Sequence, residues 1–228
     1  MPITSGPTVS ITNPRNLWEY PSFYRHYHDM PMFQRRYHPP QPPQPTLVLI
    51  DQLSYNLNDF NVPYLVWDII HPPRTACLCD RRYFRKWTMP DLSSVAIQPS
   101  VAKVWVTSDH PVLAYWIGIW GPISIQSDEI TVKDTLEGIY FYLRTHLTKS
   151  DLQHVSSEPG NRKALRYARA KRAKESSEVE AVVLKQEYRR VDVLGGHRQF
   201  QGLRIVISPD NTWRLHLGLL PGPVPRLF

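Results

Sequence analysis

Apolar residues recur at every second position across residues 101–120, VAKVWVTSDHPVLAYWIGIW. Ala102, Val104 and Val106 alternate with Lys103, Trp105 and Thr107, and Leu113, Tyr115, Ile117 and Ile119 alternate with Ala114, Trp116, Gly118 and Trp120. Ser108-Asp109-His110-Pro111 separates the two runs. Alternating β-branched and aromatic residues around a short turn are typical of a β-hairpin. The stretch therefore predicts two antiparallel strands and a fold centred on a sheet.

The spacing of apolar residues changes to a helical one after this stretch. Thr131 and Asp134 have the spacing of a capping box, and they precede a series at helical intervals, Leu136, Ile139, Tyr140, Leu143 and Leu147. We expect a helix over 132–147. Thr148 and Asp151 repeat the capping signal, which predicts a second, short helix that ends near Pro159.

A third helical segment is expected over 161–189. On a helical wheel, one arc collects its apolar residues, Ala164, Leu165, Ala168, Val179, Val182 and Val183. Arg172 and Glu175 interrupt this apolar stripe. The pattern therefore also allows a break near 174–177.

Strand signals lie on both sides of the helical region. Residues 47–50 and 65–70 are short apolar runs, 74–94 is expected to be a surface loop, and 203–207 and 213–217 alternate around a turn. The order of the expected elements, with strands at both ends and helices between them, favours an α+β fold. We expect a largely antiparallel sheet with two to three helices packed on one face, in a single domain over 46–220.

An N-terminal arm of 45 residues precedes this domain. It contains ten of the 22 prolines and ends in a proline-rich spacer at 39–45, so we expect an extended segment. The arm is also rich in aromatic residues, which suggests docking on a surface: Trp18, Tyr20, Phe23, Tyr24, Tyr27, Phe33 and Tyr37. The tail at 221–228 is expected to be irregular.

The bulk composition excludes several classes of protein. Hydrophobic residues make up 42% and charged residues 21%, which is typical of a globular chain. No run approaches the roughly 20 apolar residues of a membrane helix, and no secretory signal begins the sequence. The two cysteines, Cys77 and Cys79, are too close for an ordinary disulfide. We therefore expect a cytoplasmic protein without a membrane partner, with the nucleus as an alternative location.

The net charge of +7 comes from one segment. Residues 162–174 hold seven cations and no acid: Arg162, Lys163, Arg166, Arg169, Lys171, Arg172 and Lys174. Such a run attracts phosphate backbones or acidic protein surfaces. Surface helices also carry charge simply for solubility. This segment is the candidate site for nucleic acid or for an acidic partner.

Other residues of metal-binding, phosphate-binding or catalytic types lack the spacing that these functions need. His71, Cys77, Cys79 and Asp80 are zinc-ligand types without a second paired unit, and His26, His28 and Asp29 lie in the arm. Gly195-Gly196 lacks the flanks of a phosphate loop. We expect no metal and no cofactor, and no catalytic residue is predicted. A thiol-dependent enzyme using Cys77 or Cys79, or a hydrolytic one, is an alternative.

The tryptophans Trp67, Trp105, Trp116, Trp120 and Trp213 are expected mostly in the core. If Trp105 and Trp116 lie on the outer face of the sheet, they mark a patch for a partner.

Several spaced segments resemble a family of domains of unknown function that is expanded in mushroom-forming fungi. They are Val66-Trp67-Asp68 with Pro72-Pro73, the stretch 101–120, Ile130 to Leu136, Lys163 to Arg172, and Phe200 to Leu203. The resemblance implies a fungal protein with a proline-rich N-terminal region and one domain. No activity or catalytic residue is carried over from it.

The leading functional hypothesis is a non-enzymatic interaction or structural protein. The arm would dock on a neighbouring copy of the domain and build a homo-oligomer. The alternative is a nucleic-acid-binding protein that uses the segment 162–174.

Overall fold

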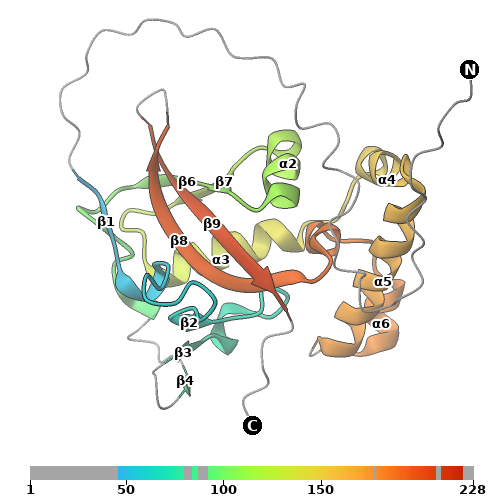
Figure 1. Cartoon of the computed structure of the whole chain (residues 1–228), viewed down its shortest axis with the longest axis horizontal. Coiled ribbons are helices and arrows are strands. Elements are labelled where there is room, and N and C mark those ends of the chain that lie inside the picture. Colours follow the sequence, from blue (N-terminus) through green and yellow to red (C-terminus); the bar gives the residue numbers. More distant parts are fainter. Residues whose placement is uncertain (1–45, 80–83, 87–91, 177, 209–211, 223–228) are drawn as a thin grey trace, which may run out of the picture.

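The computed structural model describes residues 46–79, 84–86, 92–176, 178–208 and 212–222 (Figure 1). Its centre is a four-stranded sheet with the strand order β7-β6-β9-β8. The strands are β6 (Lys103–Ser108), β7 (Ile123–Gln126), β8 (His197–Ile207) and β9 (Trp213–Pro221). β6 pairs antiparallel with β7, and β8 pairs antiparallel with β9. The two antiparallel pairs are joined by a parallel pairing of β6 with β9.

Five helices accompany this sheet among the described residues. They are α2 (Pro111–Trp120), α3 (Val132–Arg144), α4 (Lys149–Ser156), α5 (Pro159–Glu175) and α6 (Glu180–Lys185). α3 lies behind the sheet in Figure 1, and α4, α5 and α6 gather beside it. α3 approaches β7 closely, since a Cβ at Gly138 would lie 2.8 Å from Ile125 Cγ1.

Two small antiparallel sheets and three 3-10 turns are also present in the part of the chain that the structure describes. β1 (Val48–Leu49) pairs with β5 (Ile97–Gln98), and β2 (Leu65–Val66), β3 (Cys77–Cys79) and β4 (Phe84–Lys86) form the other sheet. The 3-10 turns are η3 (Asp51–Leu53), η4 (Pro73–Thr75) and η5 (Arg190–Leu194). Among the described residues, no helix is long and apolar enough to cross a membrane.

The core lies between the main sheet and α2 and α3. Its largest fully buried side chains include Trp67, Trp116 and Phe200. Trp67 also receives the Phe200 N–H on its carbonyl oxygen at 2.8 Å, so the segment after β2 is joined to the edge strand β8. Burial of such aromatic side chains is the largest single contribution to a core of this size.

The expected α+β class and most expected elements are confirmed. α3 and α4 both begin with the capping boxes expected from Thr131/Asp134 and Thr148/Asp151, with both reciprocal hydrogen bonds present. The segment 161–189 is not one helix: α5 ends at Glu175 and α6 begins at Glu180, which is the break that the sequence pattern allowed near 174–177.

The predicted hairpin at 101–120 is wrong in its second half. Residues 103–108 form β6, but 111–120 form the helix α2, whose buried residues are Val112, Leu113, Trp116 and Ile117. Pro111 cannot donate to a strand ladder but fits the first turn of a helix, and His110 caps that turn by accepting from Leu113 N. The run is apolar at almost every position, so periodicity alone could not separate strand from helix.

Three further expectations need correction. The segment 74–94 contains η4, β3 and β4, so it is not simply a loop. The apolar arc of 161–189 continues past the break only in Val183, which is buried, because Val179 and Val182 are exposed. β9 extends to Pro221, beyond the predicted strand end.

Candidate functional site

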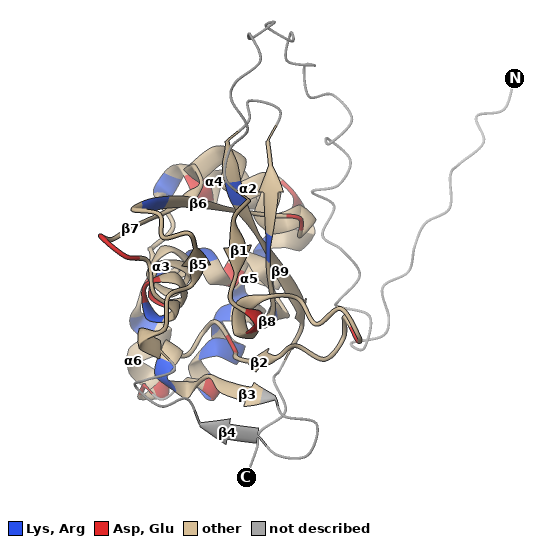
Figure 2. Ribbon diagram, turned by 90° about the vertical axis from the view of Figure 1, so that its left-hand side faces the viewer, with Lys and Arg blue, Asp and Glu red and all other residues tan. Residues whose placement is uncertain are grey.

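α5 presents its cations on the outer side of the molecule. Arg162, Lys163, Arg166 and Lys174 are exposed, and Tyr167 lies among them with half of its surface accessible. No acidic residue occurs between Arg162 and Lys174. Acidic and basic residues are interspersed over most of the fold (Figure 2), so an acid-free face of this length is unusual here. We call these four cations and Tyr167 the outer face of α5.

Arg172 does not belong to this outer face, which corrects the set predicted from the sequence. Its guanidinium is buried and donates through Nε to Asp192 Oδ1 at 2.8 Å and through Nη2 to Asp192 Oδ2 at 3.0 Å. Asp192 also accepts the backbone N–H of Arg189 at 2.9 Å. Arg172 therefore anchors α5 to η5 and is unavailable to a ligand.

The end of α5 is held by a second ion pair, between the partly exposed Glu175 and the buried Arg198. Glu175 pairs with Arg198 of β8, whose Nη2 also lies 2.9 Å from Asp68 Oδ2. Together with buried Leu165 and Ala168, these pairs fix which side of α5 faces solvent. The outer face is therefore presented by a rigid helix.

Arg169 occupies an intermediate position between the outer face and the interior. Its guanidinium carbon lies 4.2 Å from the centre of the Tyr188 ring, and its Nη1 donates to Gln186 O at 3.5 Å. A cation stacked on an aromatic face in this way is held in one orientation.

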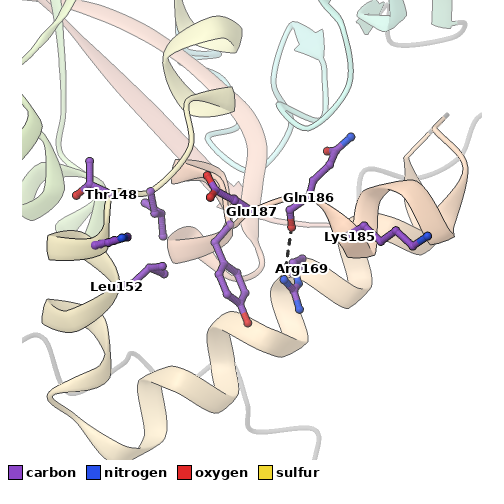
Figure 3. Close-up of a pocket in the computed structure, with 9 residues that line it drawn as sticks. Thr148, Leu152, Arg169, Lys185, Gln186 and Glu187 are labelled. Atoms are coloured by element: carbon purple, nitrogen blue, oxygen red, sulfur yellow. Dashed lines mark hydrogen bonds between the residues drawn. The ribbon is translucent and has the colours of Figure 1, made fainter.

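A pocket of about 430 Å³ lies beside Arg169 (Figure 3). It is formed where the start of α4, the middle of α5 and residues 185–188 meet. Its lining residues are Leu147, Thr148, Lys149, Leu152, Arg169, Lys185, Gln186, Glu187 and Tyr188. Three of them are cationic and one is acidic, so the pocket favours an anion. We call it the α4–α5 pocket.

A neighbouring pocket of about 500 Å³ has a different electrostatic character. It is lined by Phe141, Arg144, Thr145, His146, Gln186 and Arg189. Glu178 offsets one of the two positive charges of its arginines, with Arg144 Nη2 at 2.8 Å and Arg189 Nη2 at 3.7 Å. Burial alone would raise the pKa of Glu178, but a hydrogen bond from Gln186 and these two positive charges hold that pKa below its usual value. This pocket therefore has a smaller net positive charge than the α4–α5 pocket, whose lining holds three cations and one acid.

A polar cluster lies on the sheet where β6, β8 and β9 are adjacent. Asp109 accepts from Arg204 Nε at 2.9 Å and lies 2.5 Å from His216 Nδ1. These bonds and charges outweigh the effect of burial and lower the pKa of Asp109. Burial and the charge of Asp109 raise the pKa of the neighbouring Tyr55 to about 12. An Asp–His pair can orient a general base, but among the described residues no serine, threonine or cysteine hydrogen-bonds His216.

The other predicted site residues are placed as follows. The arm aromatics Trp18, Tyr20, Phe23, Tyr24, Tyr27, Phe33 and Tyr37 lie outside the described residues. Trp67 and Trp116 are buried, whereas Trp105 is half-buried with Lys103 Nζ 4.3 Å from its ring centre. Within the described part of the chain, no group of three His, Cys, Asp or Glu side chains is placed to hold a metal ion.

Sequence reasoning missed the contributions of Lys149 and residues 185–188 to the pocket, and the whole Asp109 cluster. Asp109 and His216 are 107 positions apart, and Lys149 is 20 positions from Arg169. No local motif connects residues at such separations, so only the folded chain reveals them.

Fold and site together define an α+β domain with a cationic helix face and an adjoining polar pocket. The family model for the family of unknown function DUF6699 matches residues 65–212. Because this match covers more than half of the chain, the protein belongs to that family. Comparisons with curated proteins and with solved structures found no match.

Proposed function

We propose that this protein is a non-enzymatic nucleic-acid-binding protein and that the outer face of α5 contacts the phosphate backbone. The observation that carries the proposal is the acid-free set of exposed cations, Arg162, Lys163, Arg166 and Lys174, on a helix anchored by the buried Arg172–Asp192 ion pair. Helical geometry separates side chains four positions apart by about 6 Å along the axis, so Arg162 and Arg166 form a row. Neutralising phosphates with such a row releases counterions and gives salt-dependent affinity.

Tyr167 favours nucleic acid over an acidic protein as the ligand. Its ring is half exposed in the middle of the cations. Aromatic side chains next to arginines provide surfaces on which unpaired bases stack. An acidic protein surface has no bases to stack on such a ring. The proposed ligand is therefore a nucleic acid with single-stranded character, bound without a sequence-reading module. The expected cytoplasmic or nuclear location is part of this proposal, as is the expected fungal distribution.

The test is a fluorescence-anisotropy titration of a labelled 20-nucleotide single strand and of the matching duplex at several salt concentrations. We expect the triple variant R162E/K163E/R166E to lose most of the affinity and to lower the salt slope by about 2 to 3, since each phosphate contact contributes about 0.7 to 0.9. The matched control is R74E/K103E/K133E, which reverses three exposed cations elsewhere on the fold. Unchanged binding of the first variant, or an equal loss in the control, would refute the proposal.

A second candidate is the self-association predicted from the aromatic arm. The observation that favours it is a set of exposed apolar side chains close in sequence, Val179, Val182 and Leu184, at the start of α6 and within it. Exposed apolar residues that gather on one surface mark interaction sites. Aromatic residues of the arm, from the same or a neighbouring copy, have the chemistry to cover them.

A further inference from the structure

The row of cations on α5 leads to the α4–α5 pocket. Arg162, Arg166 and Arg169 follow one another at intervals of four and three residues, so they lie on one side of the helix. Arg162 and Arg166 are exposed, but Arg169 is half-buried because residues 186–188 cross α5 at this point. Figure 3 shows this crossing, with Gln186 directly above Arg169. A strand that follows the row from Arg162 therefore meets a barrier at Arg169.

The pocket lies at this barrier and has the size of a small-ligand site. Its volume of about 430 Å³ is within the range of roughly 300 to 1,000 Å³ that small ligands occupy. Lys149 enters it from the first turn of α4 and Arg169 from α5. Lys185 extends away from Thr148 and Leu152 in Figure 3, so it contributes charge at longer range. An anion in the pocket would therefore be held mainly by Lys149 and Arg169.

The single acid of the pocket is turned to solvent. The side chain of Glu187 is 76% exposed, and its Oε2 lies 3.8 Å from His146 Nδ1. His146 belongs to the neighbouring pocket and does not line this one. The net charge of the lining, with three cations and one anion, is positive.

Arg169 is oriented in advance and retains an unused donor. Tyr188 supports its guanidinium from one face, and Nη1 reaches only the Gln186 carbonyl oxygen, at 3.5 Å. Its Nε is buried and has no hydrogen-bond partner among the described residues. Because Nε is buried, an anion in the pocket would accept from the Nη groups, with charge-assisted hydrogen bonds.

We propose that the α4–α5 pocket binds the terminal phosphate monoester of a nucleic-acid strand that lies along α5. This inference rests on the proposed function and adds the position of the strand end. A terminal monoester carries about 1.5 to 2 negative charges at neutral pH, whereas each phosphodiester within the strand carries one. A pocket with an oriented arginine and a lysine therefore distinguishes the end of a strand from its interior.

The test compares three labelled 12-nucleotide strands of one sequence, with a 5′-phosphate, a 3′-phosphate or hydroxyls at both ends. We expect one of the phosphorylated strands to bind at least about 10-fold more tightly than the hydroxyl strand. This preference should decrease below about pH 6, where the monoester gains a proton. If the pocket residues only stabilised the fold, protonation of the strand's terminal phosphate would not change the ratio of the two affinities.

Single variants separate the pocket from the outer face. K149A and R169Q should bring the phosphorylated strand to within about 3-fold of the hydroxyl strand. K133Q is the matched control, because this exposed lysine of α3 does not line the pocket, and it should retain the preference. E187Q should increase the affinity for the phosphorylated strand, because it removes the only acid of the lining.

The outcomes distinguish the two proposals. Equal affinity for all three strands, with the salt dependence intact, would overturn the terminal-phosphate site and leave the proposed function standing. A preference that persists in both K149A and R169Q would also overturn the site. Absence of binding by all three strands would overturn both proposals.

Discussion

Arg172 and Asp192 form a two-bond ion pair inside the protein, with Nε–Oδ1 at 2.8 Å and Nη2–Oδ2 at 3.0 Å. Only 3% of the arginine side chain and 1% of the aspartate side chain are accessible. In sequence, Arg172 is one of seven cations in an acid-free run and cannot be distinguished from its neighbours. In the fold it holds α5 against η5, so its role is structural.

Replacing Arg172 should therefore destabilise the fold. We expect R172A to lower the free energy of unfolding by about 3 to 5 kcal/mol, because the Asp192 carboxylate would stay buried without its cation. The measurement is urea unfolding followed by circular dichroism. R166A is the matched control, since this arginine is exposed, and it should change the stability by at most about 0.5 kcal/mol. A loss below about 1 kcal/mol in R172A would contradict the structural role.

Stability should also depend on the protonation of His110. Its Nδ1 accepts from Leu113 N at 3.4 Å at the start of α2, and the His197 ring lies 4.6 Å away, centre to centre. Burial, and then the proximity of His197, lower the pKa of His110 from 6.5 to about 4. The unfolded chain therefore binds this proton more readily, so stability that is present above pH 6.5 is lost as the pH falls toward 4.

The variant H110N isolates this effect, because asparagine caps a helix but does not titrate. Between pH 7 and pH 4.5 the wild type should lose about 2 to 3 kcal/mol more than the variant. The measurement is urea unfolding at several pH values. Burial also lowers the pKa of His197, but both proteins retain that residue. Parallel pH profiles of the two proteins would refute the assignment.

Gly202 is required by the close approach of η3 and the following residues to β8. Its φ is +144°, and an added Cβ would lie 2.8 Å from the Tyr55 backbone nitrogen. We expect G202A to destabilise the protein by more than about 2 kcal/mol, because a backbone atom cannot move aside as a side chain can. Gly118 of α2 offers the opposite case, with no atom within 4 Å of an added Cβ. G118A should be neutral or stabilising by up to about 1 kcal/mol in thermal or urea unfolding.

Deletion of residues 1–45 tests the self-association proposal. If the arm joins copies of the domain, the truncated protein should be a folded monomer where the full chain is a larger species. The measurement is size-exclusion chromatography with light scattering, with circular dichroism to confirm folding. A second variant, in which serine replaces the seven arm aromatics, keeps the full chain length. It therefore separates the loss of the aromatic side chains from the shortening of the chain. An unchanged oligomeric state in both proteins would exclude the arm as the contact.

Local signals predicted the helical region well. The pairs Thr131/Asp134 and Thr148/Asp151 located the starts of α3 and α4, because a capping box is formed by residues three positions apart. The same local reasoning failed for 111–120, where nearly every residue is apolar. There the choice between strand and helix depended on neighbours far away in sequence: β6 pairs with β7 and β9, and α2 packs into the core with Leu113 and Trp116.

The sequence by itself determined the α+β class, the starts of α3 and α4 and the position of the cationic run, since each depends on residues a few positions apart. Only the tertiary structure decided which cations of that run face solvent, with Arg166 exposed and Arg172 buried against Asp192. It also brought Lys149, Arg169 and Tyr188 around one pocket. The physical reason is that burial and ion pairing depend on distances in space, which the order of residues along the chain does not specify.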